Sequence, residues 1–70
     1  MKKYYRITYQ WPPGSRGAVE ATVAVEEGSK PEMIEAAVVK LSNHCGQEVR
    51  VLTINKLPSN YKALDENIIE

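Results

Sequence analysis

Apolar and polar residues alternate in two separate stretches of this 70-residue chain, and this pattern constrains its fold most. The stretches run from Tyr4 to Trp11 and from Val19 to Glu26. Alternation is typical of strands with one buried face, because successive side chains point to opposite sides. Residues 12–17 between them hold two Pro and two Gly, a composition typical of a tight connection. We therefore predict two antiparallel strands joined by a hairpin. The predicted core face comprises Tyr5, Ile7, Tyr9, Trp11, Val19, Ala21, Val23 and Val25, with Glu20, Thr22, Ala24 and Glu26 on the outer face.

A capped helix is predicted next, over residues 30–45. Ser29 has the character of an N-cap, and Glu32 follows at the spacing of a capping box. Pro31 suits the first turn, where its missing N–H would have no helical partner. Gly46 suits the left-handed position that ends a helix. The predicted buried stripe comprises Met33, Ile34, Ala37, Val38, Leu41 and Cys45.

A third strand is predicted over Val49 to Ile54, but both of its faces carry apolar residues. Val49 and Val51 lie on one side, and Leu52 and Ile54 lie on the other. Two explanations stay open. Either a β-bulge shifts the face by one residue, or the outer face of the sheet is partly buried.

These elements predict an α+β fold in the order β-β-α-β. Its three-stranded sheet, at least partly antiparallel, packs on one main helix. We expect the helix to return the chain so that the third strand lies beside the first and parallel to it. Residues 1–57 form the single domain, and residues 58–70 form a short C-terminal helix or a loosely ordered tail, with Tyr61, Leu64 and Ile68 at helical spacing.

Charge gives no strong field for a partner. Nine basic and nine acidic residues cancel over the chain. Residues 1–16 carry four cations and no acid, whereas residues 17–48 carry six Glu against two Lys. If the first two strands pair, much of this difference cancels between them, as in ordinary cross-strand complementarity.

The chain carries no recognisable catalytic, cofactor or metal motif. Cys45 is the single cysteine and His44 the single histidine, and neighbours on a helix point about 100° apart. A zinc site needs about four ligands. We therefore expect no catalytic residues, no metal and no cofactor, with Cys45 on the apolar stripe and His44 on the surface. The N-terminus has no apolar signal region and no stretch is long enough to span a bilayer, so we expect no membrane association and a cytoplasmic location.

The best candidates for function are aromatic and basic residues expected outside the core. The candidate interaction surface comprises Tyr4, Arg6, Arg16 and Arg50. Such residues are enriched at protein interfaces and also stack single-stranded bases. Neutral net charge and the lack of an RNP signature favour the protein contact.

In outline, over residues 3–56, the chain resembles short strand–strand–helix–strand proteins of bacteriophages and other mobile elements. The resemblance carries no motif and transfers no functional residue. The leading hypothesis is a non-enzymatic protein-interaction module, such as a phage or prophage accessory protein that binds and modulates a host protein. The alternative is a single-stranded nucleic-acid-binding protein that uses the outer sheet face. We expect nucleic-acid binding to be weak or absent. We also predict a homodimer, formed through a free sheet edge or through an outer face of Tyr4, Arg6, Leu52 and Ile54, unless a bulge turns the last two inward.

Overall fold

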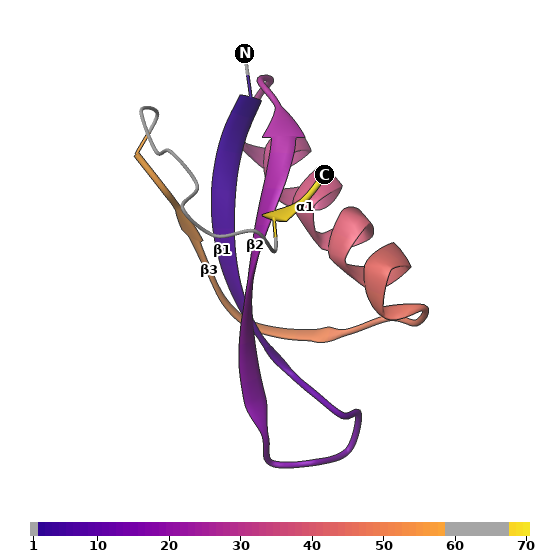
Figure 1. Cartoon of the computed structure of the whole chain (residues 1–70). Coiled ribbons are helices and arrows are strands. Elements are labelled where there is room, and N and C mark those ends of the chain that lie inside the picture. Colours follow the sequence, from indigo (N-terminus) through magenta and orange to yellow (C-terminus); the bar gives the residue numbers. More distant parts are fainter. Residues whose placement is uncertain (1, 59–67) are drawn as a thin grey trace.

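The fold is a four-stranded mixed sheet with one helix packed on one face, as seen in a computed structural model (Figure 1). The structure describes residues 2–58 and 68–70. The elements in chain order are β1 (Lys2–Gln10), β2 (Ala18–Glu26), α1 (Lys30–Cys45), β3 (Arg50–Lys56) and β4 (Ile68–Ile69). The strand order across the sheet is β3-β1-β2-β4. The α+β class and the two antiparallel N-terminal strands are therefore confirmed.

The β1–β2 hairpin is regular along its whole length. Lys2 lies opposite Glu26 at one end and Gln10 opposite Ala18 at the other, with no shift between. The connecting turn is closed by backbone hydrogen bonds, from Trp11 N to the Gly17 carbonyl and from Ser15 N to the Pro12 carbonyl. The hairpin projects beyond the helix at its turn end (Figure 1).

The core lies between the sheet and α1 and follows the predicted alternation closely. Ile7, Val23 and Leu41 are completely buried. The buried cluster comprises Tyr5, Ile7, Tyr9, Val23, Val25, Met33, Ala37, Leu41 and Val49. Val19 is predicted in the core but is 39% exposed, because it lies near the turn end of the hairpin, which projects beyond the helix (Figure 1). Thr22 and Ala24 also depart from the prediction. Their register places them on the outer face, opposite Arg6 and Tyr4, yet both are buried.

The ends of α1 lie where the capping residues predict them. The Ser29 side chain accepts a hydrogen bond from Glu32 N at 3.4 Å. Gly46 has φ +79°, and the amides of Gly46 and Gln47 donate to the carbonyls of Asn43 and Ser42. These bonds satisfy carbonyls that the helix leaves without a partner at its C-terminus.

A β-bulge in β3 resolves the two-sided pattern of that strand. Thr8 lies opposite Thr53 and Tyr9 opposite Val51, so Leu52 is an extra residue. Beyond it, Ile54 lies opposite Ile7 and packs against the core. Leu52 is 50% exposed. The bulge therefore removes Ile54 from the predicted outer contact face and leaves Leu52 exposed.

The predicted direction of β3 is wrong. β3 is antiparallel to β1, its neighbour. The helix returns the chain to the start of β2, so β3 runs parallel to β2, and β1 lies between the two. The preferred handedness of crossover connections concerns parallel strands. Here those strands are β2 and β3, whereas the prediction took β1 and β3 to be the parallel pair.

The fourth strand is also absent from the prediction. Ile68 and Ile69 pair in parallel with Thr22 and Val23, so a helix at these two residues is wrong. The rest of the predicted C-terminal helix or tail, with Tyr61 and Leu64, lies outside the described residues. Both ends of the chain lie at the same end of the sheet (Figure 1).

Candidate functional site at the outer edge of β2

The backbone of β2 has an edge that faces away from β1, and the ladder pattern shows which residues form it. Leu57 N donates to the Tyr4 carbonyl at 2.8 Å, so Tyr4 directs its backbone groups toward β3. Residues in an antiparallel strand alternate between its two neighbours. Even-numbered residues of β1 therefore face β3, and odd-numbered ones face β2. In β2 the backbone groups of Ala18, Glu20, Thr22 and Ala24 then point to the outer edge.

The half of this edge farther from the turn is covered. β4 pairs with Thr22 and Val23. The next outward carbonyl, that of Ala24, accepts a hydrogen bond from Lys40 Nζ at 2.8 Å. Lys40 therefore lies against the sheet and satisfies a backbone acceptor that a two-residue β4 does not reach.

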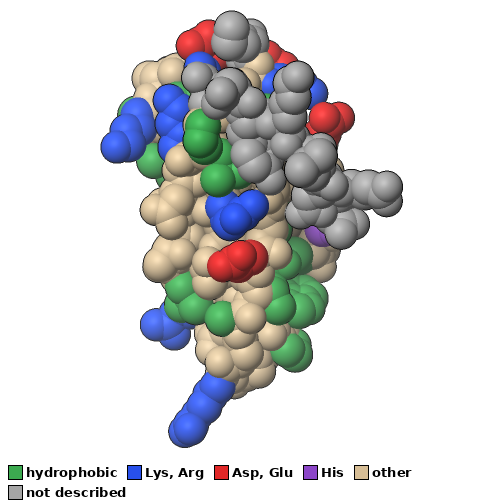
Figure 2. All heavy atoms as spheres, turned by 60° about the vertical axis from the view of Figure 1, so that its left-hand side comes forward, with side chains coloured by type: hydrophobic (Ala, Val, Ile, Leu, Met, Phe, Trp, Pro, Cys, Tyr) green, Lys and Arg blue, Asp and Glu red, His purple; other side chains and the backbone are tan. Residues whose placement is uncertain are grey.

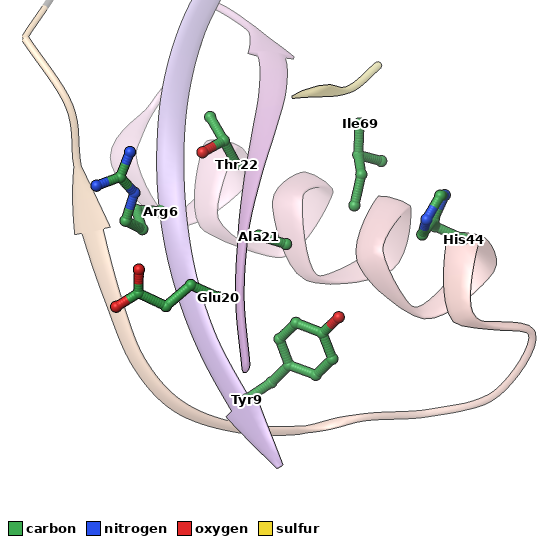
Figure 3. A pocket seen from close by; sticks show the side chains of 7 residues that line it. All are labelled: Arg6, Tyr9, Glu20, Ala21, Thr22, His44 and Ile69. Carbon is green, nitrogen blue, oxygen red and sulfur yellow. The ribbon is translucent and has the colours of Figure 1, made fainter. Parts of the chain in front are cut away.

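The half nearer the turn, Ala18–Ala21, has no strand partner on its outer side among residues 2–58 and 68–70. A hollow of about 460 Å³ lies where this half meets β4: Glu20 and Ala21 line it together with Thr22 and Ile69. Its lining comes from both sides of the sheet: Arg6, Glu20 and Thr22 from the outer face, and Tyr9, Ala21, His44 and Ile69 from the helix side (Figure 3). The hollow therefore wraps around a strand edge. We name Ala18–Ala21 with this hollow the β2 edge site.

The helix-side wall combines apolar surface with polar tips. The Cys45 thiol lies 4.0 Å from the Tyr9 hydroxyl and donates to it. Burial, followed by this contact with Cys45, raises the pKa of the Tyr9 phenol above its ordinary value. Tyr9 therefore stays protonated at neutral pH. His44 is exposed in the last turn of α1, which agrees with its predicted surface position.

The predicted interaction residues are spread over three parts of the molecule. Tyr4 and Arg6 lie half-buried on the outer face of β1, and both have interaction partners within the structure. Arg50 lies opposite Gln10, four residues along β1 from Arg6, which is about 13 Å at the rise of a strand. Arg16 is exposed in the hairpin turn. Only Arg6 of the four lines the hollow.

The charges on the outer face are interspersed (Figure 2). Lys2 lies opposite Glu26 on this face, and on the helix side of the sheet Lys3 Nζ lies 3.7 Å from the Glu27 carboxylate. This agrees with cross-strand complementarity as the origin of the uneven charge along the sequence. Among the described side chains that Figure 2 shows on this face, the basic ones form no continuous stripe.

Sequence reasoning missed the β2 edge site because an edge is a property of strand order. The alternation of apolar and polar residues distinguishes the two faces of β2, but it does not show which strands lie on either side of β2. One signal was present: Ile68 and Ile69 are adjacent β-branched residues, which favour a strand.

The comparisons with known proteins identify no relative. The chain matches no protein-family model, no curated protein and no solved structure. Within the described part of the chain, no group of three His, Cys, Asp or Glu side chains is placed to hold a metal ion. No helix in that part is long and apolar enough to cross a membrane.

Proposed function

We propose that this protein is a small non-enzymatic protein-interaction module that binds an extended segment of a partner as an added strand at the β2 edge site. The observation that carries the proposal is the hollow beside a strand edge that no residue of 2–58 or 68–70 pairs with over Ala18–Ala21. In strand addition, main-chain hydrogen bonds supply affinity and pockets for alternate side chains supply specificity. The outward backbone groups of Ala18 and Glu20 would form the main-chain hydrogen bonds, and the hollow would receive side chains of the added strand.

The walls of the hollow indicate which strand would fit. Side chains of an added strand alternate between the two faces. Those on the helix side would meet Tyr9 and His44, and those on the outer side would meet Glu20 and Thr22. A segment with an apolar residue on one face and polar residues on the other suits both walls.

The edge of β3 is a poorer receptor, although no described residue pairs with its outer side. The Leu52 bulge interrupts its ladder, and Arg50 and Lys56 place two positive charges on it with no acid. Bulges and charged side chains are the features by which edge strands resist pairing. The regular β2 edge lacks the bulge.

A proline substitution can test the β2 edge without disturbing the hairpin. The N–H of Glu20 points outward, so Glu20→Pro removes an edge donor and leaves the β1 ladder intact; proline is tolerated in such positions. The tagged protein would be used to capture partners from a bacterial lysate, treated with nuclease. We expect Glu20→Pro to lose a captured protein that the wild type retains.

Two controls separate the edge from other causes. Glu20→Gln removes the charge and keeps the N–H, so capture should persist. Lys56→Pro blocks an outward N–H on β3, so capture should also persist. Equal capture by wild type and Glu20→Pro would refute the proposal. Recovery abolished by nuclease would favour single-stranded nucleic-acid binding, and recovery of the chain itself would identify the partner as a second copy.

A further inference from the structure

The partner site already holds one strand, which belongs to the same chain. β4 pairs in parallel with β2, with Ile68 opposite Thr22 and Ile69 opposite Val23. Ile69 packs against the core and also lines the hollow. β4 therefore shows the kind of segment that this edge accepts: an extended one, parallel to β2, with branched aliphatic side chains.

The attachment of β4 within the described residues is slight. It pairs through two residues, both half-buried. Beyond them, Glu70 lies 3.8 Å from Lys2 Nζ, in an ion pair whose side chains are 43% and 65% exposed. Exposed pairs of this kind add little. A longer strand could pair with Ala18–Ala21 as well as with Thr22 and Val23.

We propose that β4 is a displaceable occupant of the partner site. The partner segment takes its place in the same parallel direction, sets a branched aliphatic residue where Ile69 lies, and extends the pairing down to Ala18. β4 thereby competes with the partner and lowers its apparent affinity. This inference rests on the proposed function, because it concerns the same edge.

The chain supplies its own ligand for the test. The probe is a fluorescent synthetic peptide with the sequence of residues 62–70, and binding to the full-length protein is followed by fluorescence anisotropy. Ile69→Asp disfavours the attached β4 and leaves the rest of the β2 edge unchanged. We expect Ile69→Asp to bind the peptide about tenfold more tightly than the wild type, because a site occupied by a competitor shows reduced apparent affinity.

Three controls keep the test decisive. A peptide with Ser in place of both Ile residues should not bind. Leu52→Asp introduces the same charge at an exposed apolar residue away from this edge and should behave as the wild type. Ile69→Ala shortens the same side chain with a smaller change in the core, and should also raise affinity, by a smaller factor, if Ile69→Asp proves unstable.

The possible results distinguish this inference from the proposed function. Equal peptide affinity for wild type, Ile69→Asp and Ile69→Ala would overturn displacement. If that equal binding were lost in Glu20→Pro, the edge would still be a strand receptor and the proposed function would stand. Absence of binding to any folded variant, up to hundreds of micromolar peptide, would also overturn the inference, while the capture experiment would decide the proposed function separately.

Discussion

Tyr5 shows how a residue can fit the core by its ring and conflict with it by its hydroxyl. The side chain is 2% exposed, as its place in the alternation predicts. Its hydroxyl is buried and has no hydrogen-bond partner among residues 2–58 and 68–70. An unpaired buried polar group costs about 1–3 kcal/mol. Sequence alternation predicts the burial of a ring, but the position of a partner for its oxygen depends on side chains that meet only in the folded molecule.

We therefore predict that Tyr5→Phe leaves the free energy of unfolding unchanged or raises it by about 1 kcal/mol. The change removes the unpaired hydroxyl and keeps the buried ring. Chemical denaturation of both proteins measures the difference. Tyr9→Phe is the matched control, because the Tyr9 hydroxyl accepts from Cys45 and its loss should not stabilise. Destabilisation by Tyr5→Phe of more than 1 kcal/mol would contradict the prediction.

The sequence predicts the bounds of helix α1, but it does not determine the pairing of strand β3. The bounds of α1 were predictable because both ends are set by local chemistry, at Ser29 and Gly46. The bulge in β3 was one of two open explanations, since the sequence cannot say which residue of β1 lies opposite Leu52. That choice depends on pairing with a strand about forty residues earlier in the chain.

At the end of α1, we predict that Gly46→Ala lowers the free energy of unfolding by about 1–2 kcal/mol, the cost of a left-handed conformation for a residue with a Cβ. A Cβ at Gly46 would meet nothing within 4 Å, so the effect comes from the backbone alone. Thermal unfolding followed by circular dichroism measures it. Gly46→Asn should cost less, because Asn tolerates this conformation better. Equal stability of the Ala variant and the wild type would show that the helix end can rearrange.

The whole molecule departs from the prediction mainly in its strand order. Composition and alternation predicted two layers with one core, and that part is confirmed by the buried cluster. The direction of β3 and the existence of β4 were missed, because both depend on which distant segments lie side by side. The β2 edge site follows from that order, so it could not be predicted from local pattern.

For the core as a whole, we predict that Leu41→Ala lowers the free energy of unfolding by about 2–5 kcal/mol, as large-to-small changes in a core do. Leu41 is 0% exposed. In a domain of this size the loss is a large part of the total stability. Val39→Ala, on the same helix but at a residue that is 50% exposed, should change stability by less than about 0.5 kcal/mol. Similar denaturation midpoints for the two variants would mean that a different helix face meets the sheet.

The bulge at Leu52 is a position where β3 could gain or lose one residue. With Leu52 removed, Val49 and the start of β3 would read Val49, Arg50, Val51, Thr53, Ile54, which is a strict alternation with each apolar residue facing the core. A single added residue thus separates this strand from a regular one. Evolution can gain or lose a residue here without changing which side chains face Ile7 and Tyr9, so length variation at Leu52 is compatible with an unchanged core.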